Sequence, residues 1–491
     1  MAIALRNNLI YFFGILFILL NSFLIYKDFY YFLLFPFALI VLYLAFFQIQ
    51  QLFLLIVFCT PLSLNLESLD LAGGLGFYLP TEPLLFGLLL IFLFKLISDK
   101  KNRINSYWKH PISFLILIQL IWIFVSSISS ELPTVSFKFL LSRIWFVVPI
   151  YFFGLYFFKK GISNIYSFLW AYLIPLTLVL VYTILTHASY GFSEESGHWV
   201  MWPFFKDHTS YGAIIALFFP VLIGIMTDKE NSFFTTSILR IMFLIFSVGL
   251  FYSYTRAAWV SVFGASLVFL LFVFKIKFKY LFSFGLLAIV FIAINFTEIN
   301  YLLNKNNAEH TTENFSERIE SISNISSDAS NLERFNRWNS AIELAKERPI
   351  AGWGPGSYSF VYAPFQDASD LTIISTNFGT GGNAHSEYLG PLAEQGIPGM
   401  VLMLLLVFFI FYRASILYIR LEDPKLKRIV MMLLLGLVTY FTHGILNNYL
   451  DTDKASIPVW GFISIIVAID LYLAPKSKVE LQTKSSISKR T

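Results

Sequence analysis

Long apolar runs alternate with short polar segments along most of the chain. Phe, Leu and Ile dominate runs of about 17 to 20 residues, long enough for a helix to cross a hydrocarbon core of ~30 Å. Because backbone polar groups in lipid must be satisfied within their own segment, each run predicts a transmembrane helix. The expected spans lie near residues 9–25, 29–47, 51–64, 83–98, 111–128, 143–158, 165–187, 211–227, 236–254, 257–274, 280–297, 396–412, 429–447 and 457–473.

This pattern predicts an all-α polytopic integral membrane protein with 12–14 transmembrane helices and a large outer loop containing short helices. The count is a range because the run at 51–64 is short and the runs at 236–254 and 257–274 are joined tightly. Three regions are expected: N-terminal transmembrane helices at 1–250, a region at 251–412 that includes the polar loop at about 298–395, and C-terminal helices with a basic tail at 413–491. No small-residue cleavage signature follows the first span, so we interpret it as a retained anchor.

The orientation follows from the basic residues in short loops. If the spans alternate, these residues fall on one side, which the positive-inside rule makes cytoplasmic. Both termini are then inside, and the segments at 65–82, 188–210 and 298–395 face outward. The basic clusters are Arg6, Lys100 to Lys109, Lys159 and Lys160, Lys275 to Lys279, Arg413 to Arg428 and Lys476 to Arg490.

Composition narrows the chemistry. The chain has 491 residues, of which 57% are hydrophobic and only 13% charged, far from soluble averages. Its single cysteine, Cys59, forms no intrachain disulfide and offers no thiolate cluster for a metal. A net charge of +5 is spread over loops without interleaved exposed aromatics, so nucleic acid is not an expected partner. No metal-ligand spacing occurs on the outer face, and no cofactor is expected.

Three short segments are expected to be irregular or interfacial. The segment 133–143 is too short to span and is interpreted as an interfacial or re-entrant helix with Lys138 and Arg143 at the outer face. The G-W-G-P-G sequence at 352–356 predicts a tight turn, because no strand precedes it as a nucleotide-binding loop would require. The helix before the span at 396–412 is expected to end at Gln395 and Gly396.

The outer loop contains one strongly patterned helix. From Leu332 to Arg348, helical spacing places an apolar arc on one side, and Pro349 ends the helix; the arc comprises Leu332, Phe335, Trp338, Ala341, Ile342 and Ala345. Arg334 projects from inside this arc and Arg337 from its edge. A guanidinium on the packed side needs an anionic partner. Two interpretations remain open: a structural ion pair, or a clamp for an anionic substrate.

A second basic position lies at a helix start. In Y-S-Y-T-R-A-A-W, residues 252–259, Ser253 or Thr255 can cap the helix that enters the membrane, which places Arg256 among free backbone N–H groups. An arginine at the outer boundary opposes the inside bias for positive charge and is a functional hypothesis. In the preceding outer loop, Lys206 and His208 are candidates for substrate contact.

His385 is the candidate for proton transfer. In G-G-N-A-H-S-E-Y-L, Asn383 is expected to cap a helix with His385 in its first turn and Glu387 on the same helix. The helix dipole there would disfavour the imidazolium, leaving a neutral ring able to accept a proton. Glu387 is a further candidate for substrate contact.

These motifs together resemble the O-antigen ligase and O-antigen polymerase superfamily of bacterial envelope glycosyltransferases. The resemblance rests on an R-x-x-x-W helix running into P-x-x-G-W-G-P-G-S-Y, then A-H-x-x-Y-L-x-x-x-x-E-x-G-I-x-G and a hydrophobic span, with T-R-A-A at 255–258 opening an earlier span. It covers residues of about 250–412. Ser386 stands where the family usually has an asparagine, so no role is assigned to an amide there.

The resemblance implies a metal-independent, inverting glycosyl transfer on the periplasmic side of the bacterial inner membrane, with both termini cytoplasmic. The donor would be a glycan on undecaprenyl diphosphate, held among membrane lipids, and the acceptor a sugar hydroxyl of lipid A-core or of a growing glycan. Arg256 and Arg334 resemble the diphosphate-binding arginines, with Arg337 as a possible substitute for Arg334. His385 resembles the histidine near the reacting hydroxyl.

The chemistry of these residues agrees with that reaction and leaves alternatives open. Guanidiniums can stabilise a departing diphosphate without a divalent cation. The sequence favours a ligase slightly over an O-antigen or exopolysaccharide polymerase. A polysaccharide or lipid transporter is the alternative of another class, although no repeated pair of broken helices, as transporters often have, is evident.

Overall fold

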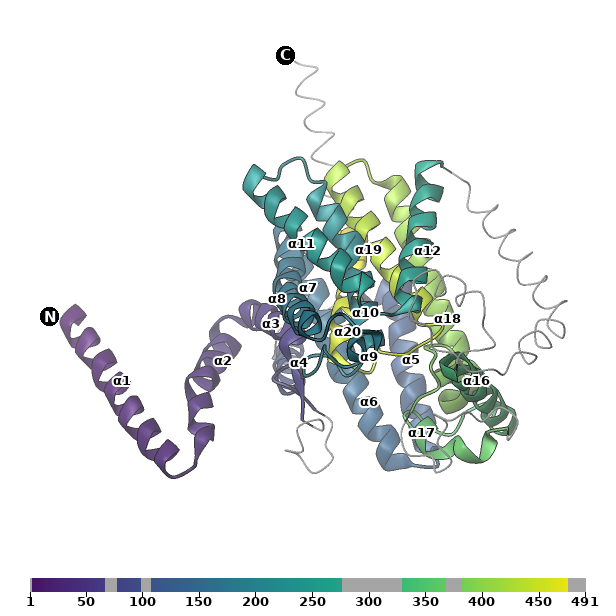
Figure 1. The fold of residues 1–491 in the computed structure, drawn as a ribbon, viewed down its shortest axis with the longest axis horizontal. Coiled ribbons are helices and arrows are strands. Elements are labelled where there is room, and N and C mark those ends of the chain that lie inside the picture. Colours follow the sequence, from purple (N-terminus) through teal and green to yellow (C-terminus); the bar gives the residue numbers. More distant parts are fainter. Residues whose placement is uncertain (1, 67–76, 99–106, 276–328, 368–381, 476–491) are drawn as a thin grey trace, which may run out of the picture. The chain divides into compact units, whose positions relative to one another are not determined.

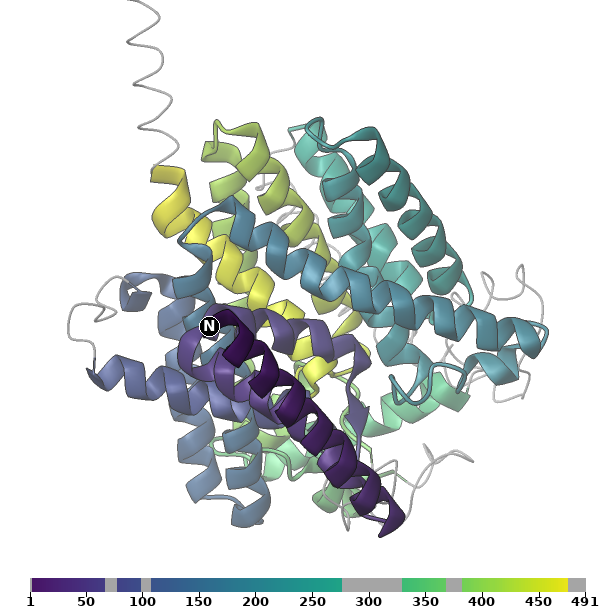
Figure 2. The ribbon, with the colours of Figure 1, turned by 90° about the vertical axis from the view of Figure 1, so that its left-hand side faces the viewer.

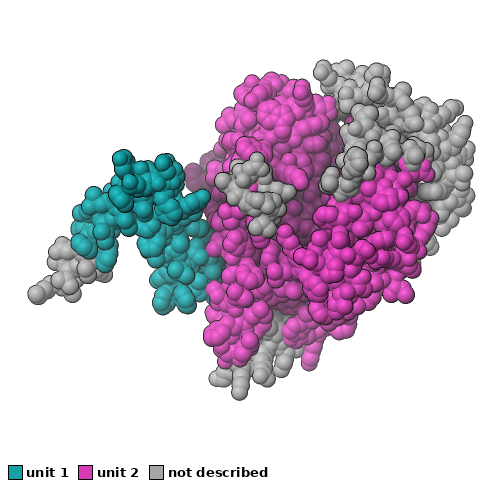
Figure 3. All heavy atoms as spheres, turned by 90° about the horizontal axis from the view of Figure 1, so that it is seen from below, with its two compact units in different colours: residues 1–55 teal, residues 56–491 magenta. Residues whose placement is uncertain are grey.

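The protein is described here from a computed structural model that covers residues 2–66, 77–98, 107–275, 329–367 and 382–475 (Figure 1). It divides into two units, residues 1–55 and residues 56–491, coloured separately in Figure 3. The expected span at 280–297, most of the polar segment at 298–328 and the basic tail at 476–490 lie outside the described residues.

The first unit is an apolar helical segment, and most of its side chains from Tyr11 to Phe47 are exposed. It contains α1 (Ala2–Tyr26), the 3-10 helix η1 (Tyr30–Leu34), α2 (Phe35–Phe47) and the start of α3 (Ile49–Cys59). Stacked rings join its elements, with Phe32 lying between Phe17 and Phe35 at centroid distances of 5.4 and 5.1 Å. No residue of α2 is buried, which suits a helix that faces hydrocarbon rather than water.

The second unit is a helical bundle with one small hairpin. It contains, in order, η2 (Thr60–Leu62), β1 (Leu64–Asn65), β2 (Tyr78–Leu79), α4 (Thr81–Ser98), η5 (Tyr107–Lys109), α5 (Pro111–Ile128), α6 (Pro133–Val147), the π-helix η6 (Val148–Phe153), α7 (Gly154–Phe158), α8 (Ile162–Ser189), α9 (Glu194–Gly197), α10 (His208–Met226), α11 (Phe233–Phe251), α12 (Arg256–Val273), α16 (Ala329–Glu347), α17 (Tyr358–Val361), η7 (Ala363–Phe365), α18 (Leu389–Arg420), α19 (Pro424–His443), α20 (Asp453–Ala468) and the π-helix η9 (Ile469–Leu473).

The fold class predicted from the sequence is confirmed: this is an all-α, multi-pass membrane protein. Within the described residues, 11 helices are long and apolar enough to cross a membrane, and Tyr11–Tyr26 and Ile49–Leu62 form shorter apolar helices. The spans that the hydrophobic runs predicted correspond to these helices, apart from 280–297, which is outside the described residues.

The prediction for residues 133–143 was wrong. These residues do not form a separate interfacial helix, because α6 continues through η6 and α7 as one apolar segment from Pro133 to Phe158. The positive charge of Arg143 within this segment is paired, because Arg143 donates from Nη2 to Asp451 Oδ1 at 2.7 Å. A paired guanidinium near a helix end costs far less in a membrane than an isolated one.

The bundle core forms around α10, α19 and α20. α10 packs against α19, and α12 packs against both. α20 runs through the interior, and every residue from Asp453 to Ala468 is buried (Figure 2). Gly436 permits close contact, because a Cβ there would lie 2.6 Å from the Leu217 carbonyl oxygen.

The two ends of the bundle have different chemistry. At one end, ion pairs join the segment after α10 to the start of α19: Lys425 to Glu230 at 2.6 Å, and Arg428 to Asp228. At the other end lie the N-termini of α10 and α12, the C-terminus of α19, and α16 beside the start of α18 (Figure 1). We call this second end the site end.

A kink in α18 holds the glycine turn that follows α16. The helix breaks at Gly396 (φ 71°, ψ −172°), where the sequence predicted its end. The turn at 352–356 packs on this break, since Trp353 N donates to Ala393 O at 3.1 Å and Gly354 N to Glu394 O at 2.8 Å. Gly352 has φ +68° and its Cβ position is filled by backbone of α18, so a side chain would not fit.

Candidate active site

The polar helix of the outer loop is α16, and its bounds, Ala329–Glu347, agree with the predicted helix. Its packed face differs from the predicted apolar arc. Ile342, expected in the arc, is 40% exposed, whereas the charged residues Glu333 and Arg337 are buried together with Ser340, Ala341 and Leu344. The prediction failed because Glu333 and Arg337 neutralise each other one turn apart, which lets charged residues occupy an interior face.

Arg337 is buried in contacts within the protein. It is 5% exposed, and its Nε donates to Glu333 Oε1 at 2.7 Å. Its Nη1 donates to Asn383 O at 3.3 Å, and the guanidinium lies 4.9 Å from the centroid of the Tyr362 ring. These contacts attach the segment that begins at Gly382 to α16.

Replacing Arg337 with methionine is expected to destabilise the fold. The change leaves the Glu333 carboxylate buried without its ion-pair partner, which costs about 3–5 kcal/mol. Thermal and denaturant unfolding of the purified chain in detergent measures this. The double variant Glu333→Leu, Arg337→Met should recover most of the loss. Lys346→Met, at an exposed position of α16, should change the free energy of unfolding by less than about 0.5 kcal/mol. An equal loss of stability in Arg337→Met and Lys346→Met would contradict the buried ion pair of Arg337.

His385 lies in a loop and not in a helix. The prediction that Asn383 caps a helix with His385 in its first turn was wrong, because α18 begins at Leu389. His385 instead has a left-handed backbone (φ +47°), and its N–H donates to Asn383 Oδ1 at 3.0 Å. The Asn383 side chain therefore closes a local turn, a conformation that asparagine favours as strongly as capping.

The environment of His385 keeps its ring neutral. Burial, followed by the positive charges of Arg334 and Arg337, lowers the pKa of His385 from 6.5 to about 4. The helix dipole invoked from the sequence has no part in this, since His385 precedes the helix. The conclusion of a neutral, proton-accepting imidazole remains, with a different physical cause.

The sequence analysis missed Asn447, which contacts His385, and His443, which Asn447 contacts in turn. The Asn447 side chain hydrogen-bonds His385 and also lies 3.1 Å, Nδ2 to Nε2, from His443. His443 is the last residue of α19 and is buried. An amide side chain therefore does contact His385, but it belongs to Asn447 and not to residue 386, which is a serine. The sequence feature that could have identified both residues is a histidine and an asparagine four residues apart at the end of a predicted span.

Arg334 connects the groups of this end electrostatically. Its side chain is half-buried, and its charge acts on His208, His385, His443 and Tyr449. Arg334 therefore lies among side chains from the starts and ends of three other segments. Of the two arginines on α16, it is the one whose side chain reaches this polar cluster and remains partly exposed.

Arg256 and His208 lie at adjacent helix starts. Arg256 is the first residue of α12, and Thr255, its N-cap residue, donates from Oγ1 to His208 O at 2.8 Å. Thr255 occupies the N-cap position, one of the two that the sequence predicted, but its side chain makes no cap bond and its hydroxyl joins α12 to α10. The His208 ring stacks on His198 at 4.3 Å.

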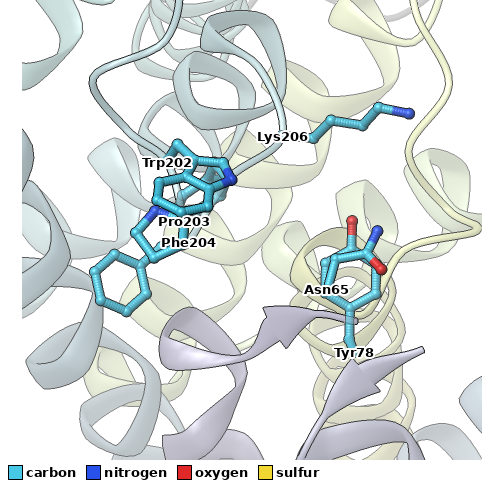
Figure 4. Close-up of a pocket in the computed structure, with 7 residues that line it drawn as sticks. Asn65, Tyr78, Trp202, Pro203, Phe204 and Lys206 are labelled. Carbon is cyan, nitrogen blue, oxygen red and sulfur yellow. The ribbon is translucent and has the colours of Figure 1, made fainter. Parts of the chain in front are cut away.

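The two other predicted contact residues differ in exposure. Glu387 is buried, and its Oε1 accepts hydrogen bonds from Tyr440 Oη (2.6 Å), Tyr449 N (2.7 Å) and Leu450 N (3.0 Å). Burial raises the pKa of Glu387. This side chain ties the His385 loop to the chain after α19. Lys206 is exposed and lines a cavity (Figure 4).

Comparison with known proteins identifies the central part of this arrangement. Residues 241–404 match the protein-family model described as O-antigen ligase. The chain contains an O-antigen ligase domain. No curated protein matches the chain.

The ligase domain supplies part of the site, and flanking helices supply the rest. Arg256, Arg334 and His385 lie within the matched residues 241–404. His208 on α10 and Asn447 after α19 lie outside them, yet both contact or electrostatically influence residues of the domain. The candidate site of this O-antigen ligase-like membrane enzyme therefore includes residues of α10 and of the segment after α19.

No metal cluster is evident in the part of the chain that the structure describes: it contains no group of three or more His, Cys, Asp or Glu side chains that could hold a metal ion. His198 and His208 stack on each other, but no third such ligand joins them. The guanidinium groups of Arg256 and Arg334 are side chains of the kind that binds a diphosphate.

Proposed function

We propose that this protein transfers a glycan from undecaprenyl diphosphate to a sugar hydroxyl, as a ligase that joins O-antigen to lipid A-core. The observation that carries the proposal is the electrostatic effect of Arg334 on His385, whose imidazole is neutral, at one end of the bundle. The match to the O-antigen ligase family supports the choice of donor and acceptor.

In the proposed reaction, the acceptor hydroxyl oxygen attacks the anomeric carbon of the donor sugar. The bond between that carbon and the diphosphate oxygen breaks, and the electron pair leaves with the diphosphate. Arg334 and Arg256 stabilise the charge that develops there. The hydroxyl proton passes to the His385 ring nitrogen that does not face Asn447, and attack from the face opposite the leaving group inverts the anomeric centre.

Arg337 and Asn447 act as positioning residues in this proposal. Arg337 holds the loop of His385 through Asn383, and Asn447 fixes the ring by accepting the hydrogen bond of its N–H. A base whose ring nitrogen is held by an amide presents its other nitrogen in one tautomer.

The proposed orientation places the site end in the periplasm and both termini in the cytoplasm of a bacterial inner membrane. The support is the charge of the loops at the opposite end, where Lys425, Lys427 and Arg428 begin α19. The exposed apolar side chains of the outer helices suit lipid and a polyprenyl tail.

A deletion strain tests the proposal directly. Mass spectrometry of the envelope polysaccharide and of undecaprenyl-linked intermediates should find lipid A-core without long chains, together with long lipid-linked polymer, and the wild-type gene should reverse both. Single repeat units on the core would indicate a polymerase instead. Donor trapped on the cytoplasmic face would indicate a transporter and would overturn the proposal.

A further inference from the structure

A separate cavity of about 250 Å³ lies between the hairpin of β1 and β2 and the segment after α9 (Figure 4). It is smaller than the ~300–1,000 Å³ typical of sites for drug-sized ligands, so it suits a single small polar ring. Its lining residues are Asn65, Tyr78, Trp202, Pro203, Phe204, Phe205 and Lys206.

One wall is polar and comes from the hairpin. Asn65 on β1 is paired with Tyr78 on β2, and the Asn65 side chain hydrogen-bonds the Tyr78 hydroxyl. Figure 4 shows the polar ends of both side chains on the side of the cavity where Lys206 extends. An amide and a hydroxyl therefore lie together and an ammonium group lines the same cavity, which is a set that recognises sugar hydroxyls and an anionic substituent.

The opposite wall is aromatic and held by its backbone. The Trp202 ring is 49% exposed, although the Trp202 carbonyl accepts a hydrogen bond from Tyr182 Oη at 3.2 Å. The neighbouring Phe204 ring packs edge-on against Tyr182 at 5.4 Å. A fixed, exposed indole presents a flat apolar surface with a polar N–H edge, as ligand-binding tryptophans do.

Buried polar contacts fix the base of the cavity. Lys454 donates from Nζ to Thr60 O at 2.6 Å and to Ser63 O at 2.8 Å, and it lies 5.5 Å from the Phe205 ring centroid and 5.8 Å from that of Tyr78. The lining rings therefore rest on a hydrogen-bonded ammonium group. This makes the cavity preformed, which lowers the entropic cost of binding.

Asp207 links the cavity to the site end. Lys206 is followed by Asp207, the N-cap residue of α10, whose charge acts on Tyr78 in the cavity and on Tyr449 near Arg334. A glycan that reacts beside Arg334 and His385 can therefore extend toward Lys206.

We propose that this cavity binds an acidic sugar residue of the glycan substrate. One ring face packs on Trp202, the hydroxyls bond Asn65 and Tyr78, and the carboxylate pairs with Lys206. This subsite deepens the proposed glycan transfer and rests on it for its role in the reaction. Its binding chemistry is testable without any transfer.

The test measures binding of trigalacturonic acid and of neutral maltotriose to the purified protein in lipid nanodiscs, by saturation-transfer NMR. Wild type should bind the acidic trisaccharide about tenfold more tightly, because one charge-assisted contact contributes about that much. Lys206→Ala should abolish this preference, while Asn65→Ala and Trp202→Ala should weaken both ligands. Equal binding of both sugars by wild type, or unchanged affinities in all three variants, would overturn the proposal.

Trp199→Ala is the matched control for Trp202→Ala. Trp199 is a similarly exposed tryptophan of the same segment that packs on Tyr190 and does not line the cavity, so its loss should leave both affinities unchanged. Arg334→Ala separates this proposal from the proposed function. Arg334→Ala should greatly slow transfer and leave trisaccharide binding unchanged. If the wild-type protein binds the acidic trisaccharide but transfers no glycan, the proposed subsite stands and the proposed transferase function is refuted.

Discussion

Replacing His385 with alanine should lower the turnover of glycan transfer by about 10²–10⁴-fold, the usual contribution of a positioned general base. The change removes the neutral ring that takes the acceptor proton and leaves the contacts of Arg334 and Arg337 in place. An in vitro assay with undecaprenyl-diphosphate-linked glycan and purified lipid A-core measures it. The KM for the donor should change little, because the diphosphate is held by arginines.

The pH profile gives an independent reading of the same role. The pKa of His385 is lowered to about 4, so the ring is neutral above that value, and kcat/KM should stay level from mildly acidic to neutral pH and fall only as the pH approaches 4. With a general base at the ordinary pKa of 6.5, kcat/KM would already fall as the pH drops through 6.5. A profile that falls at 6.5, or His385→Ala with near wild-type turnover, contradicts the assignment.

The variant Asn447→Leu tests whether Asn447 positions the His385 ring or only supports the fold. The Asn447 hydrogen bond raises the pKa of His385, so its loss should lower that pKa further and move the acid limb of the profile down. Turnover should fall less than in His385→Ala, since the base remains. His443 would lose its Asn447 contact too, and a circular-dichroism melt checks that the end of α19 stays folded.

The helices of this protein could be predicted from sequence because a lipid environment leaves few alternatives to the backbone. Hydrophobic runs marked the spans, Pro349 marked the end of α16, and Gly396 marked the break in α18. Each of these features depends on residues that are close together in sequence. The continuous segment from Pro133 to Phe158 was missed because residues 133–143 were considered separately from the apolar run that follows and so taken as too short to span.

The site could be predicted only in part for the same reason. Arg334 and His385 were recognised from local motifs, but their surroundings come from distant segments: His443 and Asn447 follow a span that carries no recognised motif. The relative burial of Arg334 and Arg337 was also misjudged, because it depends on Glu333, Asn383 and Tyr362 filling the interior around Arg337. A periodicity argument counts apolar side chains and does not include such compensated charges.

Arg334→Ala should reduce kcat by about 10²–10³-fold, comparable to the loss of one preorganised group that stabilises charge in a transition state. The guanidinium is expected to bind the diphosphate most strongly as the anomeric bond breaks, so kcat should fall more than the KM for the donor rises. Arg334→Lys should recover part of the activity, since an ammonium supplies charge without the bidentate geometry. The assay is the same transfer of glycan to lipid A-core.

Lys346→Ala is the matched control, because Lys346 is an exposed cation of the same helix that pairs with Glu343. It should transfer glycan at the wild-type rate. A second readout needs no turnover: the positive charge of Arg334 lowers the pKa of His385, so Arg334→Ala should raise that pKa above about 4, as followed by NMR of ¹³C-labelled histidine. Loss of activity with an unmoved His385 pKa would mean that Arg334 supports the fold at a distance, and the shared site proposed for the leaving group and the base would then fail.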